Sequence, residues 1–207
     1  MRGNRERGNT LMKFRLNYTG PLPSSSKTPH HKAKMAIRRA VHVQLKELWK
    51  IHPLLKHFDQ PAYDPITSGT GTVFPPQFEL GHWNFLPLVN RKMDLVCAID
   101  VLMFRRQEPG GIIKNTGDID NQLTTLFDAL RMPLIEKELA DEQPTNGERP
   151  LYCLLEDDSL IVRESVDTDR LLEPLGKDSE VRLVIQVSVK ATRLTGENRL
   201  FVGYDVE

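Results

Sequence analysis

Apolar and polar positions alternate in several parts of the chain, and this two-residue period predicts β-strands. Residues 12–18 and 181–189 show the alternation most clearly and should each form a half-buried strand. Residues 93–104 are almost continuously apolar, which is typical of a central strand covered on both faces. Residues 159–166 should form a further strand, followed by a polar connection over residues 167–178.

Two other segments repeat apolar residues every three to four positions, which is the helical period. Residues 32–51 should form one helix, which Pro53 ends, and residues 121–131 a second. The expected buried side chains are Ile37, Val41, Leu45, Leu48 and Trp49 in the first helix and Leu123, Leu126, Phe127 and Leu130 in the second. The resulting β-α-β-α-β-β order predicts an α+β fold, with helices packed on a mixed β-sheet.

Two long connections interrupt this pattern. Residues 53–90 are rich in Pro, Gly, Thr and aromatic residues, which predicts either a functional loop or an inserted hairpin. Their aromatic side chains could stack on exposed bases, or they could form a small core of their own. Residues 132–150 are acidic, and a helix is expected over residues 136–142. Residues 1–10 are expected to form a disordered leader and residues 11–207 a single domain.

Composition places the chain among soluble globular proteins, because 39% of its residues are hydrophobic and 27% are charged. No stretch approaches the roughly 20 apolar residues of a membrane span, and the first residues lack the apolar core of a secretory signal. Cys97 and Cys153 lack partners at metal-ligand spacing, so two buried free thiols are expected, with a disulfide as the alternative. Free thiols suit a reducing, cytoplasmic location.

The net charge of zero hides an asymmetry along the chain. Residues 1–115 hold 18 Lys and Arg against 8 Asp and Glu, whereas residues 116–207 hold 10 against 20. A basic half beside an acidic half suits a protein that holds a polyanion and keeps carboxylates for a metal ion. The alternative is that the two halves interleave in the fold and their charges cancel.

The strongest nucleic-acid surface is predicted on the first helix and its flanks. Residues 27–57 contain eight Lys and Arg, five of the six histidines and a single acid, Glu47. An ordinary solvated helix face usually mixes the two signs, so the one-sided charge favours binding to phosphates. The histidines are expected to be backbone contacts or surface residues rather than metal ligands. The predicted DNA contacts on this helix are Lys32, Lys34, Arg38 and Arg39.

The chemistry should centre on residues 117–130, where two carboxylates stand one residue apart ahead of the second helix. Asp120 or Asn121 is a natural N-cap, because its side-chain oxygen can accept a backbone N–H. A cap does not explain Asp118, since two ionised carboxylates held close repel unless a cation lies between them. Arg105, Arg106 and Lys114 lie in or beside the basic loop before Asp118 and are expected to grip a phosphate backbone.

A second acidic cluster, Glu156, Asp157 and Asp158, lies between two apolar runs. Carboxylates at a strand end are costly unless they are hydrated, paired or bound to a metal. Mg²⁺ prefers oxygen ligands and usually takes one or two carboxylates together with waters and substrate phosphate. The alternative is a solvated acidic turn. Asp100, in the predicted central strand, stays unassigned.

Together these segments resemble the RusA family of Holliday junction resolvases. The resemblance rests on Asp118-Ile119-Asp120-Asn121, on a helix that contains Asp128-Ala129-Leu130, and on Asp157-Asp158-Ser159-Leu160-Ile161. It implies that Asp118, Asp120 and Asp158 are catalytic metal ligands, with Asp157 assisting and Asp128 supporting.

The resemblance further implies a homodimeric endonuclease that resolves branched DNA in recombination and repair, leaving 5′-phosphate and 3′-hydroxyl ends. Its cofactor would be Mg²⁺, or Mn²⁺ in its place, with no organic cofactor and no membrane partner. The family usually carries a lysine four residues after the second Asp of the pair, where this chain has Thr124. Two alternatives therefore stay open: a RusA-like protein that binds branched DNA without cutting it, and a metal-stabilised module with no DNA role.

Overall fold

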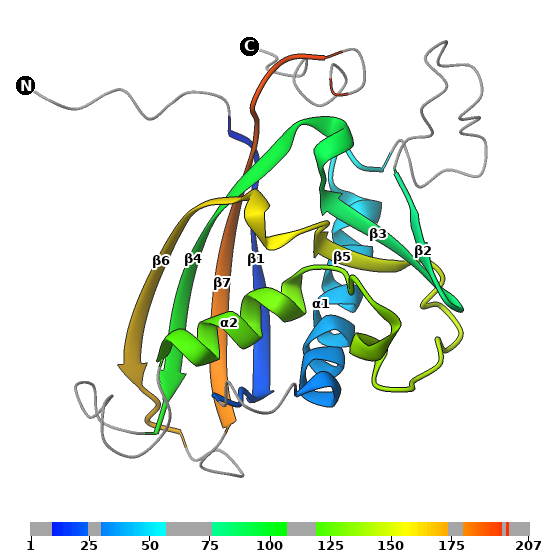
Figure 1. Ribbon diagram of the computed structural model, residues 1–207. Coiled ribbons are helices and arrows are strands. Elements are labelled where there is room, and N and C mark those ends of the chain that lie inside the picture. Colours follow the sequence, from blue (N-terminus) through cyan, green and yellow to red (C-terminus); the bar gives the residue numbers. More distant parts are fainter. Residues whose placement is uncertain are drawn as a thin grey trace, which may run out of the picture.

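The computed structural model describes residues 10–24, 30–56, 76–106, 119–173, 180–195 and Asn198. Its main sheet has four strands in the order β1-β7-β4-β6 (Figure 1). These strands are β1 (Thr10–Pro21), β4 (Leu95–Arg105), β6 (Ile161–Arg170) and β7 (Glu180–Ala191). β7 is antiparallel to both of its neighbours, whereas β4 and β6 are parallel. The predicted α+β class and mixed sheet are confirmed.

A second sheet, which the sequence pattern did not predict, has three strands in the order β2-β3-β5. They are β2 (Phe78–Leu80), β3 (Trp83–Val89) and β5 (Leu151–Leu155). β2 and β3 form an antiparallel hairpin, so the inserted-hairpin alternative is right for the described part of the first connection. Residues 57–75 of that connection lie outside the described residues, as do residues 1–9 of the leader predicted over residues 1–10, whose last residue, Thr10, instead begins β1.

Two helices pack against the sheets, and α2 crosses in front of the main sheet in Figure 1. They are α1 (His31–Ile51), which contacts β1 and β5, and α2 (Ile119–Leu130), which contacts α1 and β5. The predicted stripe of α1 is buried except for Leu48, which is partly buried against the core. No helix in the described ranges is long and apolar enough to cross a membrane.

The buried face of α2 differs from the predicted one. Leu126 and Leu130 are buried as expected, but Leu123 and Phe127 are only partly buried against the core. Gln122 is buried instead, and its side-chain amide donates to the carbonyl oxygen of Leu22 at 3.0 Å. This polar anchor turns α2 about its axis relative to the orientation that the apolar spacing alone would give.

The core lies between the helices and the inner face of the main sheet, where alternate strand residues are buried as predicted. In β7 these residues are Val181, Leu183, Ile185, Val187 and Val189, each no more than 3% exposed. Cys97 and Cys153 are buried free thiols, which confirms the prediction and excludes a disulfide between them. Burial raises the pKa of each thiol to about 12, so neither forms a thiolate at neutral pH.

Two predicted boundaries are wrong. The helix expected over residues 136–142 is a single 3-10 turn, η3 (Glu136–Leu139), because Ala140 and Asp141 adopt positive φ angles of 56° and 57° that end it. Residues 167–170, expected to be a connection, continue β6 because they pair with the last residues of β4.

Candidate functional site

The acidic motif begins at the first turn of α2. The helix starts at Ile119, so Asp120 lies inside the first turn and is not the N-cap that the sequence suggested. Its side chain is exposed, and a carboxylate near a helix N-terminus is favoured by the helix dipole. Asp118 lies outside the described residues.

Thr124 lies one turn beyond Asp120 and is also exposed. Its hydroxyl donates to the main-chain carbonyl oxygen of Asp120 at 2.8 Å. The two residues therefore share a stripe of α2, as their spacing of four predicts. A lysine at this position would place a cation beside Asp120, and Thr124 does not supply one.

The second acidic cluster connects β5 to a short 3-10 turn, η4 (Asp158–Leu160). Asp157 is the N-cap of η4: its carboxylate accepts from the backbone N–H of Ser159 at 3.0 Å and pairs with Arg91 at 3.2 Å. Hydrogen bonds from Ser159 and the charge of Arg91 hold the pKa of Asp157 below its ordinary value. Glu156 accepts from the backbone N–H of Arg91 at 2.8 Å. A capped turn held by Arg91 therefore accounts for both side chains without a metal.

Asp158 is placed differently from its neighbours. It is exposed at the start of η4 and borders a shallow hollow of about 420 Å³. The residues that line this hollow are Phe127, Asp158, Ser159, Ile161, Val162, Arg163 and Glu164. Phe127 belongs to α2, so the helix that carries the first acidic cluster shares this surface with the turn that carries the second.

Of the two exposed carboxylates, Asp158 lines the hollow, whereas Asp120 lies farther along α2 from it. Asp120 precedes Phe127 by seven residues, which is roughly 10 Å along a helix axis. Within the described ranges, no three His, Cys, Asp or Glu side chains gather as ligands for one ion. Asp120 and Asp158 offer the oxygen donors that Mg²⁺ prefers, but a complete ligand set would also need Asp118.

Asp128, on the third turn of α2, joins that helix to α1. Its carboxylate lies 2.5 Å from the Lys34 ammonium and 3.0 Å from the Arg131 guanidinium. Burial alone would raise the pKa of Asp128, but the hydrogen bonds and charges of Lys34 and Arg131 outweigh it and lower the pKa. Asp128 therefore links α2 to α1, and Lys34, predicted to contact DNA, is used inside the fold.

Arg38 was also predicted to contact DNA, and that prediction is wrong. Its side chain is 2% exposed and donates to the carbonyl oxygens of Asp128 at 2.7 Å and Arg131 at 3.2 Å. Glu138 of η3 lies 3.4 Å from the same guanidinium. The cation is enclosed between α1, α2 and η3, where a phosphate cannot reach it.

The acidic segment, residues 132–150, neutralises the next turns of α1. Arg39 pairs with Glu142 and, at 2.8 Å, with Glu148, and its guanidinium lies 5.8 Å from the centre of the Trp83 ring. Lys46 donates to the carbonyl oxygen of Gly147 at 2.9 Å. The two oppositely charged halves of the sequence therefore interleave here, as the alternative reading of the charge asymmetry held. Lys32 alone of the four predicted contacts is exposed.

The second group of predicted DNA contacts consists of Arg105, Arg106 and Lys114, and the two that the structure describes are not exposed. Arg105 ends β4 and is 4% exposed, so its prediction as a surface cation is wrong. Arg106 is partly buried, and Lys114 lies outside the described residues. Asp100, left unassigned, accepts from Arg163 at 2.8 Å and from Gln186 at 3.2 Å on the outer face of the main sheet.

His42 of α1 is buried and bonds to the backbone of β5 and of the acidic segment. It is 5% exposed; its Nδ1 accepts from the backbone N–H of Tyr152 at 2.9 Å, and its Nε2 lies 3.2 Å from the carbonyl oxygen of Gly147. Burial lowers the pKa of His42, and the charge of Lys46 lowers it further. The expectation that it is a surface residue is wrong.

Acidification is expected to destabilise the protein through His42. Because its folded pKa lies below the ordinary value of about 6.5, the unfolded chain takes up a proton that the folded chain resists. Stability should therefore fall as pH drops below about 6.5, by up to about 1.4 kcal/mol per unit until the folded pKa is reached. Urea unfolding on both sides of this pH, compared between the wild type and His42→Gln, isolates the effect. Identical pH slopes in the two proteins would exclude it.

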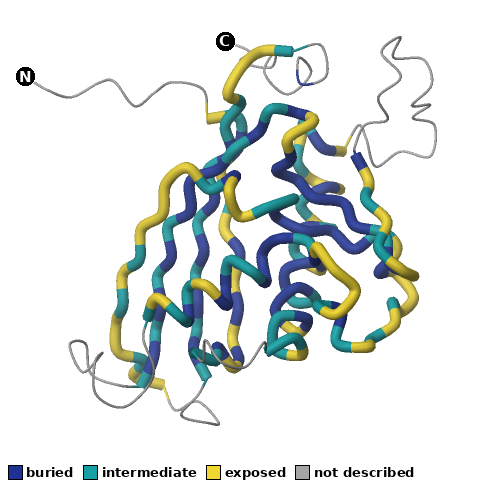
Figure 2. Tube along the Cα trace, in the orientation of Figure 1, coloured by how far each residue is buried: buried dark blue, intermediate teal, exposed yellow. Residues whose placement is uncertain are grey.

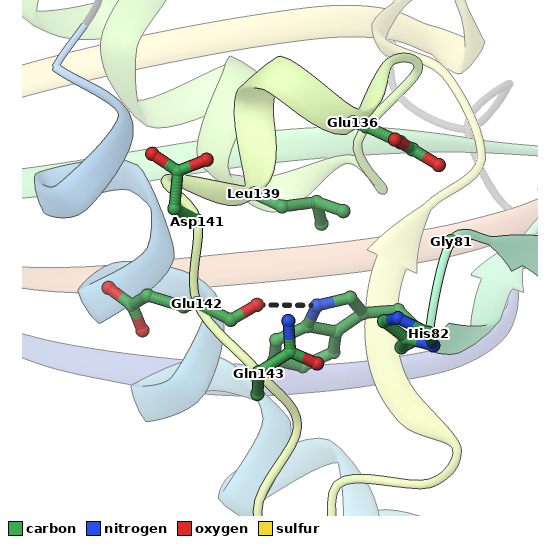
Figure 3. Close-up of a pocket in the computed structure, with 8 residues that line it drawn as sticks. Gly81, His82, Glu136, Leu139, Asp141, Glu142 and Gln143 are labelled. Carbon is green, nitrogen blue, oxygen red and sulfur yellow. Dashed lines mark hydrogen bonds between the residues drawn. The ribbon is translucent and has the colours of Figure 1, made fainter.

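A second hollow of about 170 Å³ lies between the β2–β3 turn and the acidic segment (Figure 3). Trp83 donates through Nε1 to the carbonyl oxygen of Glu142 at 3.1 Å and closes one side. The carboxylates of Asp141 and Glu136 point away from each other in Figure 3, so they do not converge on a common ligand. No sequence pattern indicated this hollow, because its lining residues come from segments that are distant along the chain.

Comparisons of the chain with protein-family models, with curated proteins and with solved structures found no match.

Proposed function

We propose that this protein is a Mg²⁺-dependent endonuclease that cuts branched DNA, similar to the RusA resolvases of recombination and repair. The observation that carries the proposal is that two acids of the motif, Asp120 and Asp158, have exposed side chains on elements that contact each other, α2 and η4. The two exposed acids are those that the resemblance assigns to the metal, together with Asp118.

The arrangement of the elements supports the same proposal. The main-sheet strands and the two helices follow one another along the chain as β1-α1-β4-α2-β6-β7. The full order also contains β2 and β3 before β4, and β5 before β6, so the support it gives is coarser: an α+β fold with a mixed main sheet. α2 and η4, which carry the two acidic clusters, are in contact.

In the proposed reaction, Asp118, Asp120 and Asp158 would hold Mg²⁺, or Mn²⁺ in its place. The ion would lower the pKa of a bound water and neutralise charge on the phosphate in the transition state. The protein itself would position these carboxylates and leave the hollow accessible to the DNA strand that is cut.

The experiment is incubation of the protein with a synthetic four-way junction, with and without Mg²⁺. A linear duplex of the same sequence serves as the control substrate. We expect nicked products from the junction only when Mg²⁺ or Mn²⁺ is present. Cleavage of both substrates at equal rates, or products in the presence of a chelator, would contradict the proposal.

A second candidate function is binding of branched DNA without turnover, and Thr124 favours it. Transition-state charge on a phosphate is best stabilised by a cation held close to it. The hydroxyl of Thr124 instead bonds to the main chain of its own helix. This candidate predicts a salt-sensitive gel shift of the junction with no cleaved products.

Thr124→Lys is expected to raise the cleavage rate by about 10- to 100-fold if the site is an impaired nuclease. The position is exposed on α2, and lysine has the higher helix propensity, so the fold should not suffer. Single-turnover cleavage of the junction measures the rate. The matched control is Thr124→Gln. Glutamine is nearly as long as lysine but carries no charge, so this variant should leave the cleavage rate unchanged.

A further inference from the structure

The last residue of β4, Arg105, is a buried cation. The burial pattern of this strand places its side chain on the inner face of the main sheet, with those of Val101 and Met103. Its Nη1 is buried and has no hydrogen-bond partner among the residues that the structure describes. Burial lowers the pKa of this guanidinium, and no carboxylate in the same ranges counteracts it. A buried, permanently charged donor is strongly unfavourable unless an acceptor compensates it.

A second arginine lies beside Arg105. The parallel register of β4 and β6 places Arg105 opposite Arg170, so both side chains are on the inner face. Like charges directly opposite each other destabilise a sheet. β6 is mostly exposed, whereas β4 is mostly buried or intermediate (Figure 2). Arg170 is itself exposed, so the pair of arginines borders solvent on the β6 side.

Arg38 shows how this fold accommodates a buried arginine that has a structural role. It is 2% exposed, donates to two main-chain carbonyl oxygens and lies 3.4 Å from the carboxylate of Glu138. Arg105 is 4% exposed and has no such set of acceptors within the described ranges. This contrast indicates that Arg105 is available to an acceptor from outside the chain.

The first turn of α2 lies at the same end of the main sheet. Gln122 of that turn donates to Leu22, which directly follows β1. β1 and β4 both end beside the first residues of β7, so Leu22 and Arg105 share this end. The N-terminus of a helix favours an anion. The carboxylate of Asp120 would oppose one, but Asp120 is exposed and Gln122 is buried, so the two lie on different sides of α2.

We propose that Arg105 and Arg170 form a site for one phosphate group at the carboxyl ends of β4 and β6. The planar guanidinium of Arg105 presents parallel N–H donors that match two oxygens of a phosphate. The anion also places negative charge between two cations that otherwise repel. The site goes beyond the proposed function, because neither arginine is among the ligands assigned to the metal.

Calorimetric titration with inorganic phosphate tests the site, at constant ionic strength and without metal or DNA. The wild type should bind one phosphate per chain. Arg105→Met should weaken binding by at least about tenfold, because charge-assisted hydrogen bonds are lost. Arg105→Lys keeps the charge without the planar fork and should recover only part of the affinity. Lys32→Met is the matched control: it removes an exposed cation from α1 and should bind like the wild type.

Urea unfolding separates this site from a purely structural role. Without phosphate, Arg105→Met should be at least as stable as the wild type, because it removes a buried charge that has no counter-ion. Added phosphate should raise the unfolding midpoint of the wild type and leave that of Arg105→Met unchanged. Arg38→Met makes the same substitution at an engaged arginine and should lower the midpoint in both buffers.

Competition with a short single-stranded oligonucleotide identifies the source of the phosphate. Displacement of bound phosphate assigns the site to a nucleic-acid strand, and failure to displace it assigns the site to free phosphate or a small phosphorylated molecule. The inference is overturned if the wild type binds no phosphate or if Arg105→Met binds it equally well. A loss of stability for Arg105→Met in phosphate-free buffer would also overturn it. None of these measurements contains Mg²⁺ or a junction, so they are independent of whether the protein cuts DNA.

Discussion

Asp120→Asn is expected to reduce Mg²⁺-dependent junction cleavage by at least about 100-fold while junction binding is kept. An amide is a poor ligand for a hard cation, and even the outer partners of metal ligands typically contribute 10- to 100-fold. Asp120 is exposed in the first turn of α2, so the variant should lose less than about 1 kcal/mol of stability, chiefly from the helix dipole. The loss of activity would then report on the site and not on the fold.

Two companion variants sharpen this measurement. Asp158→Asn should behave like Asp120→Asn, because the proposal assigns both carboxylates to the same ion. Asp157→Asn is the matched control: asparagine caps η4 as well as aspartate does and loses only the pair with the exposed Arg91, so the variant should lose less than about 1 kcal/mol of stability and still cut. Single-turnover rates and gel shifts on one junction give both readouts. Normal cutting by Asp120→Asn would remove this residue from the site.

Arg38→Met is expected to cost about 3 kcal/mol of unfolding free energy, the largest stability effect among the substitutions considered. Removing one member of a buried ionic group leaves the others without their partner. Here the carbonyl oxygens of Asp128 and Arg131 lose their donor, and Glu138 keeps only Arg131 as a counter-ion. A domain of this size typically has a total stability of about 5–15 kcal/mol, so the loss is a large fraction.

Urea unfolding followed by circular dichroism at neutral pH measures this cost. Lys32→Met is the matched control, because it removes a cation from the same helix at an exposed position and should change stability by less than about 0.5 kcal/mol. A loss below about 1 kcal/mol for Arg38→Met would mean that water replaces the missing hydrogen bonds. The result does not depend on any DNA activity.

The secondary structure was largely predictable because the apolar period is a local property. The alternation in residues 181–189 gave β7, and the helical spacing of Ile37, Val41 and Leu45 gave α1. The rotation of α2 was not predictable, because the polar residue Gln122 is buried to reach Leu22, 100 residues earlier in the chain. The second sheet was missed for a similar reason, since β3 pairs with β5 across a long stretch of sequence.

The sequence was enough to identify the acidic residues of the candidate site, but not to tell which of them are exposed at the surface. The sequence marked Asp120, Asp128, Asp157 and Asp158 together, and nothing local distinguished the exposed side chains from the partly buried ones. The structure separates them, because Lys34 reaches Asp128 from α1 and Arg91 reaches Asp157 from the turn after β3. The burial of these two carboxylates therefore depends on residues that are distant from them in the sequence.

By itself, the sequence determined the α+β class, the main strands and helices and the acidic motif, because these follow from periods and spacings within a few residues. Only the tertiary structure decided which charges face solvent. The basic face of α1 looked like a nucleic-acid surface, yet Arg39 pairs with Glu148, which is 109 residues away. The strength of an ion pair depends on distance in space. Basic and acidic residues lie in different halves of the sequence, so the sequence alone does not show that the fold brings them together.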